Sequence, residues 1–220
     1  MSEKTPQLIR SIHARLIAGK IVLFVVLAIA VAELSIVARA DIALADSIHS
    51  LASGWLTTGA LAVTELASTD VILIATAGAV VALAASRHWR GAIALGVSVL
   101  ATQAVVSVAK ELAERPRPDE HGAMVESGGF SFPSAHSASA VALYVMLAVI
   151  AGSALRGRVR DSAWAVAIAL ALAIGVSRVY LGAHYPTDVL AGWLTGGILV
   201  VGSWALCARL PVRGTAPAAA

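Results

Sequence analysis

The chain has 220 residues, of which 59% are hydrophobic and only 13% are charged, and its mean hydropathy is +0.84. Soluble domains contain about 45–50% apolar and about 25% charged residues, so this composition excludes most soluble enzymes. A disordered chain is excluded too, because disorder requires low hydrophobicity and high net charge, and the net charge here is only +3. The composition is that of an integral membrane protein.

Six stretches are apolar for long enough to cross a bilayer as helices. A spanning helix needs about 20 mostly apolar residues, at a rise of about 1.5 Å per residue. The sequence therefore predicts an all-α bundle in a single membrane-embedded domain over residues 1–220, with a disordered tail from Arg213. The predicted transmembrane helices cover residues 21–38, 69–86, 91–110, 135–155, 162–180 and 187–207.

The distribution of charge between the ends of these spans predicts their orientation. Cytoplasmic loops of membrane proteins collect Lys and Arg. Eleven of the sixteen basic residues lie on the side that carries both termini, and five lie on the other side. We therefore expect both termini in the cytoplasm, a location in the inner membrane, and the loops 39–68, 111–134 and 181–186 outside.

Two local patterns predict helix packing. In the first outer loop, apolar residues recur at helical spacing and polar residues fall on the opposite face, which predicts an amphipathic helix lying in the membrane interface. The alternative is a short amphipathic helix that serves only in packing. The apolar positions are Leu44, Ile48, Leu51 and Trp55, and the polar positions are Asp46, His49, Ser50 and Ser53. In the sixth span, Gly192 and Gly196 form a pair of small residues four apart, which is typical of close contact between helices.

Ionisable residues cluster at three places, all at the outer ends of predicted spans. Such clusters are informative because charged side chains are costly in a bilayer. The clusters are residues 110–118, 132–137 and 177–188, and their members include Lys110, Arg117, His136, Arg178, His184 and Asp188. In the second cluster Ser134 is a favourable helix cap, so the backbone N–H groups that follow it are free to bind an anion.

Each cluster also has an interpretation without chemistry. Lys110, Arg115 and Arg117 are typical of cations that reach the interface from helix ends, and Asp188 of an acid favoured at a helix N-terminus. The convergence of three cations, two histidines, one carboxylate and one helix start at a single membrane level favours a site. Cations and free N–H groups bind a multiply charged anion, while histidines with a carboxylate provide a nucleophile and an acid. The pattern predicts a site for a phosphate on a membrane lipid.

These residues resemble the three motifs of the type 2 phosphatidic acid phosphatases, also called lipid phosphate phosphatases, whose site is similar to that of vanadium haloperoxidases. The family has a Lys followed after six residues by Arg-Pro, then Pro-Ser-Gly-His, then Ser-Arg with a His and an Asp further on. The matching residues are Lys110, Arg117-Pro118, Pro133-Ser134-Ala135-His136, Ser177-Arg178, His184 and Asp188. One position departs: Ala135 replaces the family's Gly, which keeps the backbone N–H but disfavours a positive φ.

The resemblance implies a role for each matched residue. His184 is the nucleophile that forms a phosphohistidine, Asp188 fixes the tautomer of its ring, and His136 protonates the leaving oxygen and later activates water. The phosphate-binding residues implied by the motifs are Lys110, Arg117, Ser134, Ala135 and Arg178. Arg115 falls outside the motif positions, so we expect it to be largely dispensable.

We expect neither a metal nor another cofactor. Phosphoryl transfer needs fixed positive charge on the phosphate oxygens, which many phosphatases supply with two metal ions. Here the three cations and the helix start can supply it, and the sequence has no carboxylate cluster to hold metals. Its single cysteine, Cys207, excludes a Cys-based zinc site and an intramolecular disulfide, and its scattered basic residues do not predict a nucleic-acid partner.

The expected partner is a lipid of the surrounding bilayer, and the sequence leaves several lipids open. Polyprenyl diphosphates such as the undecaprenyl carrier and phosphatidylglycerol phosphate are the leading substrates, and lipid A phosphate and phosphatidic acid are further ones. The alternative function is a non-catalytic lipid-phosphate binding or transport protein, which needs the cations but neither His184 nor Asp188. The sequence does not indicate an oligomeric state.

Overall fold

Every secondary-structure element is a helix in the computed structural model, which describes residues 4–118 and 123–208. This confirms the all-α prediction, while the tail from Arg213 lies outside the described residues. In chain order the elements are α1 (Lys4–Glu33), α2 (Ser35–His49), α3 (Gly54–Glu65), α4 (Thr69–Ala85), α5 (Trp89–Ala113), α6 (Ala135–Ala140), the π-helix η1 (Val141–Val145), α7 (Met146–Ala154), α8 (Gly157–Tyr180) and α9 (Pro186–Cys207).

The membrane spans agree in number with the sequence prediction. In the described part of the chain, five helical stretches are long and apolar enough to cross a bilayer, and α3 with α4 adds a sixth if this pair, bent by 45°, is one span. Because α6, η1 and α7 follow without a break, they form one stretch from Ala135 to Ala154. The other four are Ala14–Glu33, Trp89–Ala113, Gly157–Tyr180 and Pro186–Cys207.

The first span differs from its predicted bounds of 21–38. Helix α1 ends at Glu33, because Leu34 has an extended backbone with φ −101° and ψ 105°, and α2 then begins in a new direction. The apolar stretch instead begins at Ala14 and so includes Lys20. The Lys20 ammonium lies over Gly197 of α9, where a Cβ atom would come within 2.7 Å of it. A glycine therefore provides the space for this cation inside the bundle.

The predicted amphipathic helix is only partly correct. The chain does form a helix, α2, but it ends at His49, and Trp55 belongs to α3, so Leu51 and Trp55 do not continue the apolar face of α2. The buried side of α2 consists of Asp41 and Ala45 instead. A buried acid in the first outer loop was not predicted, because the apolar pattern was followed only from Leu44 onward, although Asp41 lies on the same helix face as Ala45 and Ile48.

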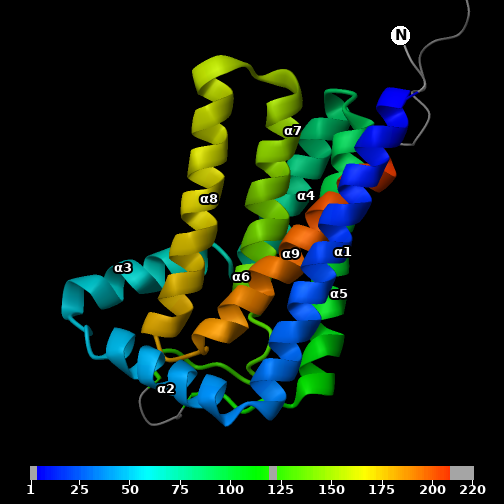
Figure 1. The fold of residues 1–220 in the computed structure, drawn as a ribbon. Coiled ribbons are helices and arrows are strands. Elements are labelled where there is room, and N and C mark those ends of the chain that lie inside the picture. Colours follow the sequence, from blue (N-terminus) through cyan, green and yellow to red (C-terminus); the bar gives the residue numbers. More distant parts are fainter. Residues whose placement is uncertain (1–3, 119–122, 209–220) are drawn as a thin grey trace, which may run out of the picture.

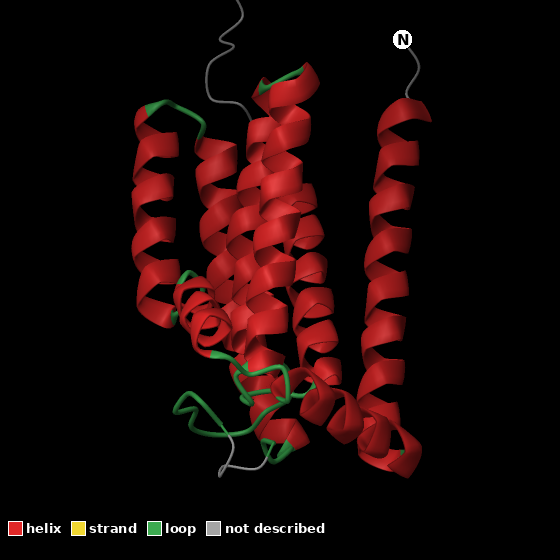
Figure 2. Ribbon diagram, turned by 90° about the vertical axis from the view of Figure 1, so that its left-hand side faces the viewer, coloured by secondary structure: helices red, strands yellow, loops and turns green. Residues whose placement is uncertain are grey.

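The loops gather at the two ends of the bundle. In Figure 1 the N-terminal end of α1 and the turn between α7 and α8 lie at the top, whereas α2 and the turn between α8 and α9 lie at the bottom. Figure 2, turned by 90°, shows the long helices roughly parallel, with most of the irregular chain at one end. Three segments were predicted to be outer loops: 39–68, 111–134 and 181–186. Their described residues lie at, or lead to, the same end of the bundle.

Helix α9 organises this end of the bundle by packing against α1, α5 and α6. A Cβ atom added at Gly192 would lie 2.5 Å from the carbonyl oxygen of Ser134, and one added at Gly196 would lie 2.5 Å from that of Ala138. The two glycines therefore let the backbones of α9 and α6 touch, which confirms the predicted close packing. This contact joins the second and third sequence clusters.

Candidate active site

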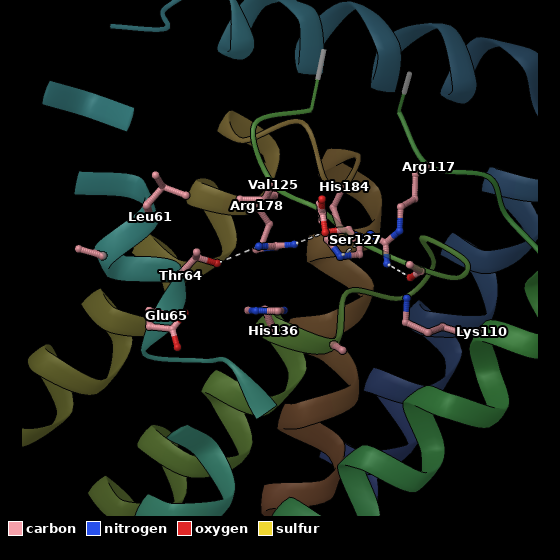
Figure 3. A pocket seen from close by; sticks show the side chains of 14 residues that line it. Leu61, Thr64, Glu65, Lys110, Arg117, Val125, Ser127, His136, Arg178 and His184 are labelled. Atoms are coloured by element: carbon pink, nitrogen blue, oxygen red, sulfur yellow. Dashed lines mark hydrogen bonds between the residues drawn. The ribbon is translucent and has the colours of Figure 1, made fainter. Parts of the chain in front are cut away.

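The three sequence clusters meet at one cavity of about 650 Å³ (Figure 3). Its walls come from the last turn of α5, the first residues of α6, the last turn of α8, the turn before α9, the end of α3 and the loop 114–134. The motif residues that line it are Lys110, Arg117, Ala135, His136, Arg178 and His184. Four helix ends and two loops therefore bring together side chains that are up to 74 positions apart in the sequence.

A histidine and a carboxylate form a buried pair at the wall of this cavity. The side chain of His184 is 2% exposed, that of Asp188 is 0% exposed, and Nδ1 of the ring lies 3.4 Å from Oδ2 of the acid without making a full hydrogen bond. The other ring nitrogen, Nε2, lies 3.3 Å from Nη1 of Arg117. Burial lowers the pKa of His184 to about 4, against the opposing pull of Asp188, so the ring is neutral at neutral pH.

Backbone groups hold this pair in place. Asp188, in the first turn of α9, accepts a hydrogen bond on Oδ2 from the backbone N–H of Tyr185 at 2.9 Å. Its own carbonyl accepts one from the N–H of Ser134 at 2.9 Å. The Ser134 hydroxyl accepts from the N–H of Ser137 and so caps α6. Ser134 is fully buried and does not line the cavity, so it positions the helix start instead of facing the cavity as we expected.

Arg117 is held mainly by backbone carbonyls. Its guanidinium donates to the carbonyl oxygens of Gly128, Gly129 and Ala183 at 2.8–3.0 Å. Burial lowers the pKa of Arg117, but an arginine starts from so high a value that it stays charged. Carbonyls orient the group without neutralising it, so its positive charge remains available to an anion beside His184.

Arg178 and Lys110 complete the positive wall. Arg178 donates to the hydroxyls of Thr64 and Ser127 at 3.1 and 2.9 Å, and its Nε is buried without a hydrogen-bond partner. Among the described residues no carboxylate pairs with it. Lys110 donates to the carbonyl of Phe130. None of the three cations forms an ion pair with a carboxylate among the described residues, which favours the binding of an anion beside them.

Part of the wall has the opposite character. Glu65 and Glu126 also line the cavity, together with the apolar residues Leu61, Ala62 and Val125. In Figure 3, Glu65 and His136 lie on the same side of Arg178, whereas Arg117 and His184 lie on the other side. The cavity thus has a cationic part and a part that combines acidic with apolar groups.

Arg115, which we expected to be largely dispensable because it falls outside the motif positions, is mostly buried in the structure. Its side chain is 13% exposed and forms two ion pairs, with Asp188 at 2.6 Å and with Asp41 at 2.7 Å. It is therefore no snorkelling cation of the membrane interface. Sequence reasoning also missed Asp41, Thr64 and Ser127, because none of them belongs to a motif. The position of Asp41 on the apolar face of the predicted outer helix was the signal that could have identified it.

No group of three or more His, Cys, Asp or Glu side chains within residues 4–118 and 123–208 has the arrangement of a metal site. The donors around the cavity are mainly cationic nitrogens, which repel metal ions. Asp188, the acid nearest the histidine, already accepts hydrogen bonds from Arg115 and Tyr185.

The sequence also matches a known family model, that of the PAP2 superfamily, over residues 91–210. This range is more than half of the chain and contains all three motifs. The chain belongs to the PAP2 superfamily. It is a membrane phosphatase that acts on lipid phosphates or diphosphates, as its named relatives in the family do.

Two curated relatives and one crystal structure illustrate the similarity. The chain is 30% identical to phosphatidylglycerophosphatase B of Bacillus subtilis over 80% of this chain and 87% of the relative. It is 34% identical to decaprenylphosphoryl-5-phosphoribose phosphatase of Mycolicibacterium smegmatis, over 61% and 70% of the two chains. The crystal structure of a transmembrane PAP2-type phosphatidylglycerolphosphate phosphatase from Bacillus subtilis superposes with a TM-score of 0.79 at 27% identity, covering 90% of this chain and 98% of that one.

Proposed function

We propose that the chain removes the terminal phosphate from a membrane lipid through a phosphohistidine on His184, without a metal ion. The observation that carries the proposal is the buried pair of a neutral His184 and the Asp188 carboxylate, at the wall of a cavity lined by three cations that form no ion pair with a described carboxylate. A cation-lined cavity alone suits binding. A histidine with one ring nitrogen toward a carboxylate and the other near the phosphate-binding groups also suits nucleophilic attack.

The attack follows from the two faces of the imidazole. Nδ1 carries the proton and faces Asp188, so Nε2 has the lone pair that attacks phosphorus. The Nε2–P bond forms as the P–O bond to the lipid breaks, and the carboxylate stabilises the positive charge that develops on the ring. Arg117 lies 3.3 Å from Nε2, where its N–H groups can turn from the ring to the oxygens of a bound phosphate.

His136 supplies the proton that the leaving oxygen requires. It lines the cavity from the second position of α6, and in the proposed cycle it enters as the imidazolium. After transfer, neutral His136 takes a proton from water, and the resulting hydroxide attacks phosphorus and releases inorganic phosphate and His184. The imidazolium of His136 is restored, so the cycle balances.

Fixed cations take the place of metal ions in this scheme. Lys110, Arg117 and Arg178, with the backbone N–H groups of Ala135 and His136, surround the non-bridging oxygens, and positive charge there is what phosphoryl transfer requires. We expect full activity in excess chelator after removal of bound metals. Loss of activity with chelator and recovery with Mg²⁺ would contradict a metal-free mechanism.

The acidic and apolar part of the cavity favours phosphate monoesters with an uncharged leaving group. The leaving group must lie on the side of His136, where Glu65 also lies. Glu65 accepts hydrogen bonds from hydroxyls of a glycerol or sugar headgroup but repels the second phosphate of a diphosphate. The names of the relatives from Bacillus subtilis and Mycolicibacterium smegmatis, a phosphatidylglycerophosphatase and a phosphoribose phosphatase, fit this class of substrate.

The charge distribution supports an active site on the outer face of the inner membrane. The turn between α7 and α8 lies at the end of the bundle opposite the cavity, and the exposed residues there are Arg156 in the turn and Arg158 and Arg160 in the first turn of α8. Basic turns of this kind remain in the cytoplasm. The cavity at the other end then meets lipid headgroups of the outer leaflet.

Phosphate release from a panel of detergent-solubilised lipids tests this function. We expect release from phosphatidylglycerol phosphate to exceed release from a polyprenyl diphosphate, and Glu65→Gln to narrow that difference. His184→Ala should abolish release, whereas His88→Ala, an exposed histidine at the start of α5, should behave as wild type. An acid-labile, base-stable phosphoenzyme should appear in wild type and in His88→Ala but not in His184→Ala. Wild-type turnover in a folded His184→Ala variant would show that His184 is not the nucleophile. Lipid binding without turnover in wild type would favour the binding or transport alternative.

A further inference from the structure

Arg115 bridges two buried carboxylates behind the catalytic pair. Its Nη1 lies 2.6 Å from Oδ1 of Asp188 and its Nη2 lies 2.7 Å from Oδ2 of Asp41. The two acid side chains are 0% and 2% exposed, and the arginine is 13% exposed. The guanidinium also donates to the Thr187 hydroxyl at 2.9 Å and packs 4.3 Å from the centre of the Tyr185 ring. Both acids and the ring therefore hold this guanidinium in one orientation.

Asp41 connects this arrangement to a distant part of the chain. It belongs to α2, and its carboxylate accepts hydrogen bonds from the backbone N–H of Thr187 at 3.0 Å and from the Thr187 hydroxyl. Asp41 therefore holds both Arg115 and the first turn of α9, in which Asp188 lies. A helix that precedes every motif by about 70 positions thus contacts the two residues that flank the catalytic carboxylate, Arg115 and Thr187.

Neither Arg115 nor Asp41 lines the cavity, so neither touches a bound phosphate. Their connection to the reaction runs through Asp188, whose two oxygens are divided between different partners. Oδ1 faces Arg115, while Oδ2 accepts from the N–H of Tyr185 and faces Nδ1 of His184. Arg115 thus fixes the rotation of the carboxylate about its own axis, which decides whether Oδ2 points at the imidazole.

We propose that Arg115 and Asp41 are positioning residues for the reaction, which hold Asp188 in the orientation and charge state that His184 needs as the nucleophile. This rests on the proposed function, in which His184 attacks phosphorus. The amphipathic helix α2 then belongs to the catalytic machinery, because its buried face supplies Asp41.

A purely structural role, in which the ion pairs only attach α2 to α9, makes a different prediction. Loss of a structural contact lowers the melting temperature and the folded fraction but leaves the kinetics of the folded molecules unchanged. Loss of a positioning contact lowers kcat, because the nucleophile is misaligned, while KM changes little, because the phosphate-binding cations remain. It also changes the charge near the imidazole and so the pH dependence.

The direction of the pH change follows from the charges around the catalytic pair. Arg115, Asp188 and Tyr185 face it from behind, Asp41 faces it through α2, and Lys110, Arg117, His136 and Arg178 face it across the cavity. Removing the positive charge of Arg115 raises the pKa of His184, so the acid limb of kcat/KM should move to higher pH by about one unit. Removing the negative charge of Asp41 should move it to lower pH.

The experiment compares five variants of the full chain with wild type in detergent, with one lipid phosphate monoester as the substrate. Arg115→Gln should lower kcat by roughly 10–100-fold with KM within about threefold of wild type. Arg115→Lys should keep the acid limb in place and recover part of kcat. The matched controls are Arg39→Gln and Asp46→Asn, both exposed on α2, which should match wild type. Asp41→Asn provides the opposite shift of the acid limb.

The pH profiles are read as the ratio of each variant to wild type, so ionisation of the substrate cancels. Folded Arg115→Gln with wild-type kcat and an unmoved acid limb would overturn the proposal. If Arg115→Gln does not fold, Arg115→Lys and Asp41→Asn decide: wild-type kcat in Arg115→Lys together with wild-type kcat and an unmoved acid limb in Asp41→Asn would overturn it equally. Failure of the proposed function has a different signature, since His184→Ala would then retain turnover whatever Arg115 does.

Discussion

Arg178 combines deep burial with a guanidinium that has no acidic partner among the described side chains. Thr64 and Ser127 fix its two terminal nitrogens, and its Nε is buried without a partner. A guanidinium held in this way presents a planar set of donors, which a phosphate can accept in pairs, whereas a lysine ammonium is a single point of charge.

Arg178→Lys should therefore lose most activity although it keeps the charge. Loss of one charge-assisted hydrogen bond predicts a fall in kcat/KM of roughly 10–100-fold. The matched control is Arg158→Lys, an exposed arginine near the other end of the same helix, which should leave kcat/KM unchanged. Near wild-type turnover in Arg178→Lys would show that only the charge matters at this position.

His184 links the site to the pH dependence of stability. Burial lowers its pKa to about 4 in the folded protein, against about 6.5 in the unfolded chain. Between these values the unfolded state binds more protons, so the free energy of unfolding decreases by about 1.4 kcal/mol per pH unit as pH falls from 6.5 to 4. His184→Gln, which does not titrate, should lose less melting temperature than wild type between pH 7 and pH 4.5. Equal losses would contradict a neutral buried imidazole.

The residues that sequence reasoning identified are those with a recognisable spacing. Lys110, Arg117, His136, Arg178 and His184 stand at motif positions, and all of them line the cavity. Arg115 and Asp41 were missed because their importance arises from a contact across 74 positions that no local pattern records. Ser134 caps α6 as its residue type predicted, but this motif position does not line the cavity.

Among the elements, α6 and α9 approach each other so closely at Gly192 that no side chain fits between them. Gly192→Ala places a methyl group 2.5 Å from the carbonyl oxygen of Ser134, a backbone atom that cannot move without shifting the start of α6. Overpacking of this kind costs typically 1–3 kcal/mol. Since α6 begins at the phosphate site, the variant should lose both melting temperature and specific activity.

Gly78→Ala provides the matched control, because a Cβ at Gly78 in α4 meets nothing within 4 Å. Alanine has the higher helix propensity, so this variant should be as stable as wild type in detergent. Wild-type melting and activity in Gly192→Ala would mean that α6 and α9 are not in contact as described. The comparison separates the effect of close packing from the general effect of replacing a helical glycine.

Hydropathy predicted the lengths of the membrane spans more accurately than it predicted where the helices break. The last four predicted spans agree with the described helices to within five residues at each end, because about 20 apolar residues leave little freedom in a bilayer. The break at Leu34 and the gap between His49 and Gly54 were not predicted. At both places the sequence pattern continues although the chain changes direction. In the gap before Gly54, a tertiary contact helps to set that direction, namely the hydrogen bond from the Ser53 N–H to the Tyr180 hydroxyl.

At the scale of the whole molecule, the bundle separates two chemically different ends. The end with the cavity carries α2 and the loop 114–134, which interlock with the turn between α8 and α9 through hydrogen bonds such as that from the Met124 N–H to the Leu181 carbonyl. The opposite end carries short turns with exposed arginines. A phosphatase with this arrangement acts at one membrane surface, so its orientation decides which leaflet supplies the substrate.

Cysteine labelling tests the orientation of the whole chain. Cys207 is the single cysteine and is buried, so Cys207→Ser gives a background without a thiol. In right-side-out membrane vesicles, a membrane-impermeant maleimide should label Asp46→Cys on α2 but not Arg158→Cys near the turn between α7 and α8, because basic turns stay in the cytoplasm. Both should label after the vesicles are opened with detergent. If only Arg158→Cys were labelled in sealed vesicles, the orientation would be the opposite of the one proposed, and the site would lie at the inner leaflet.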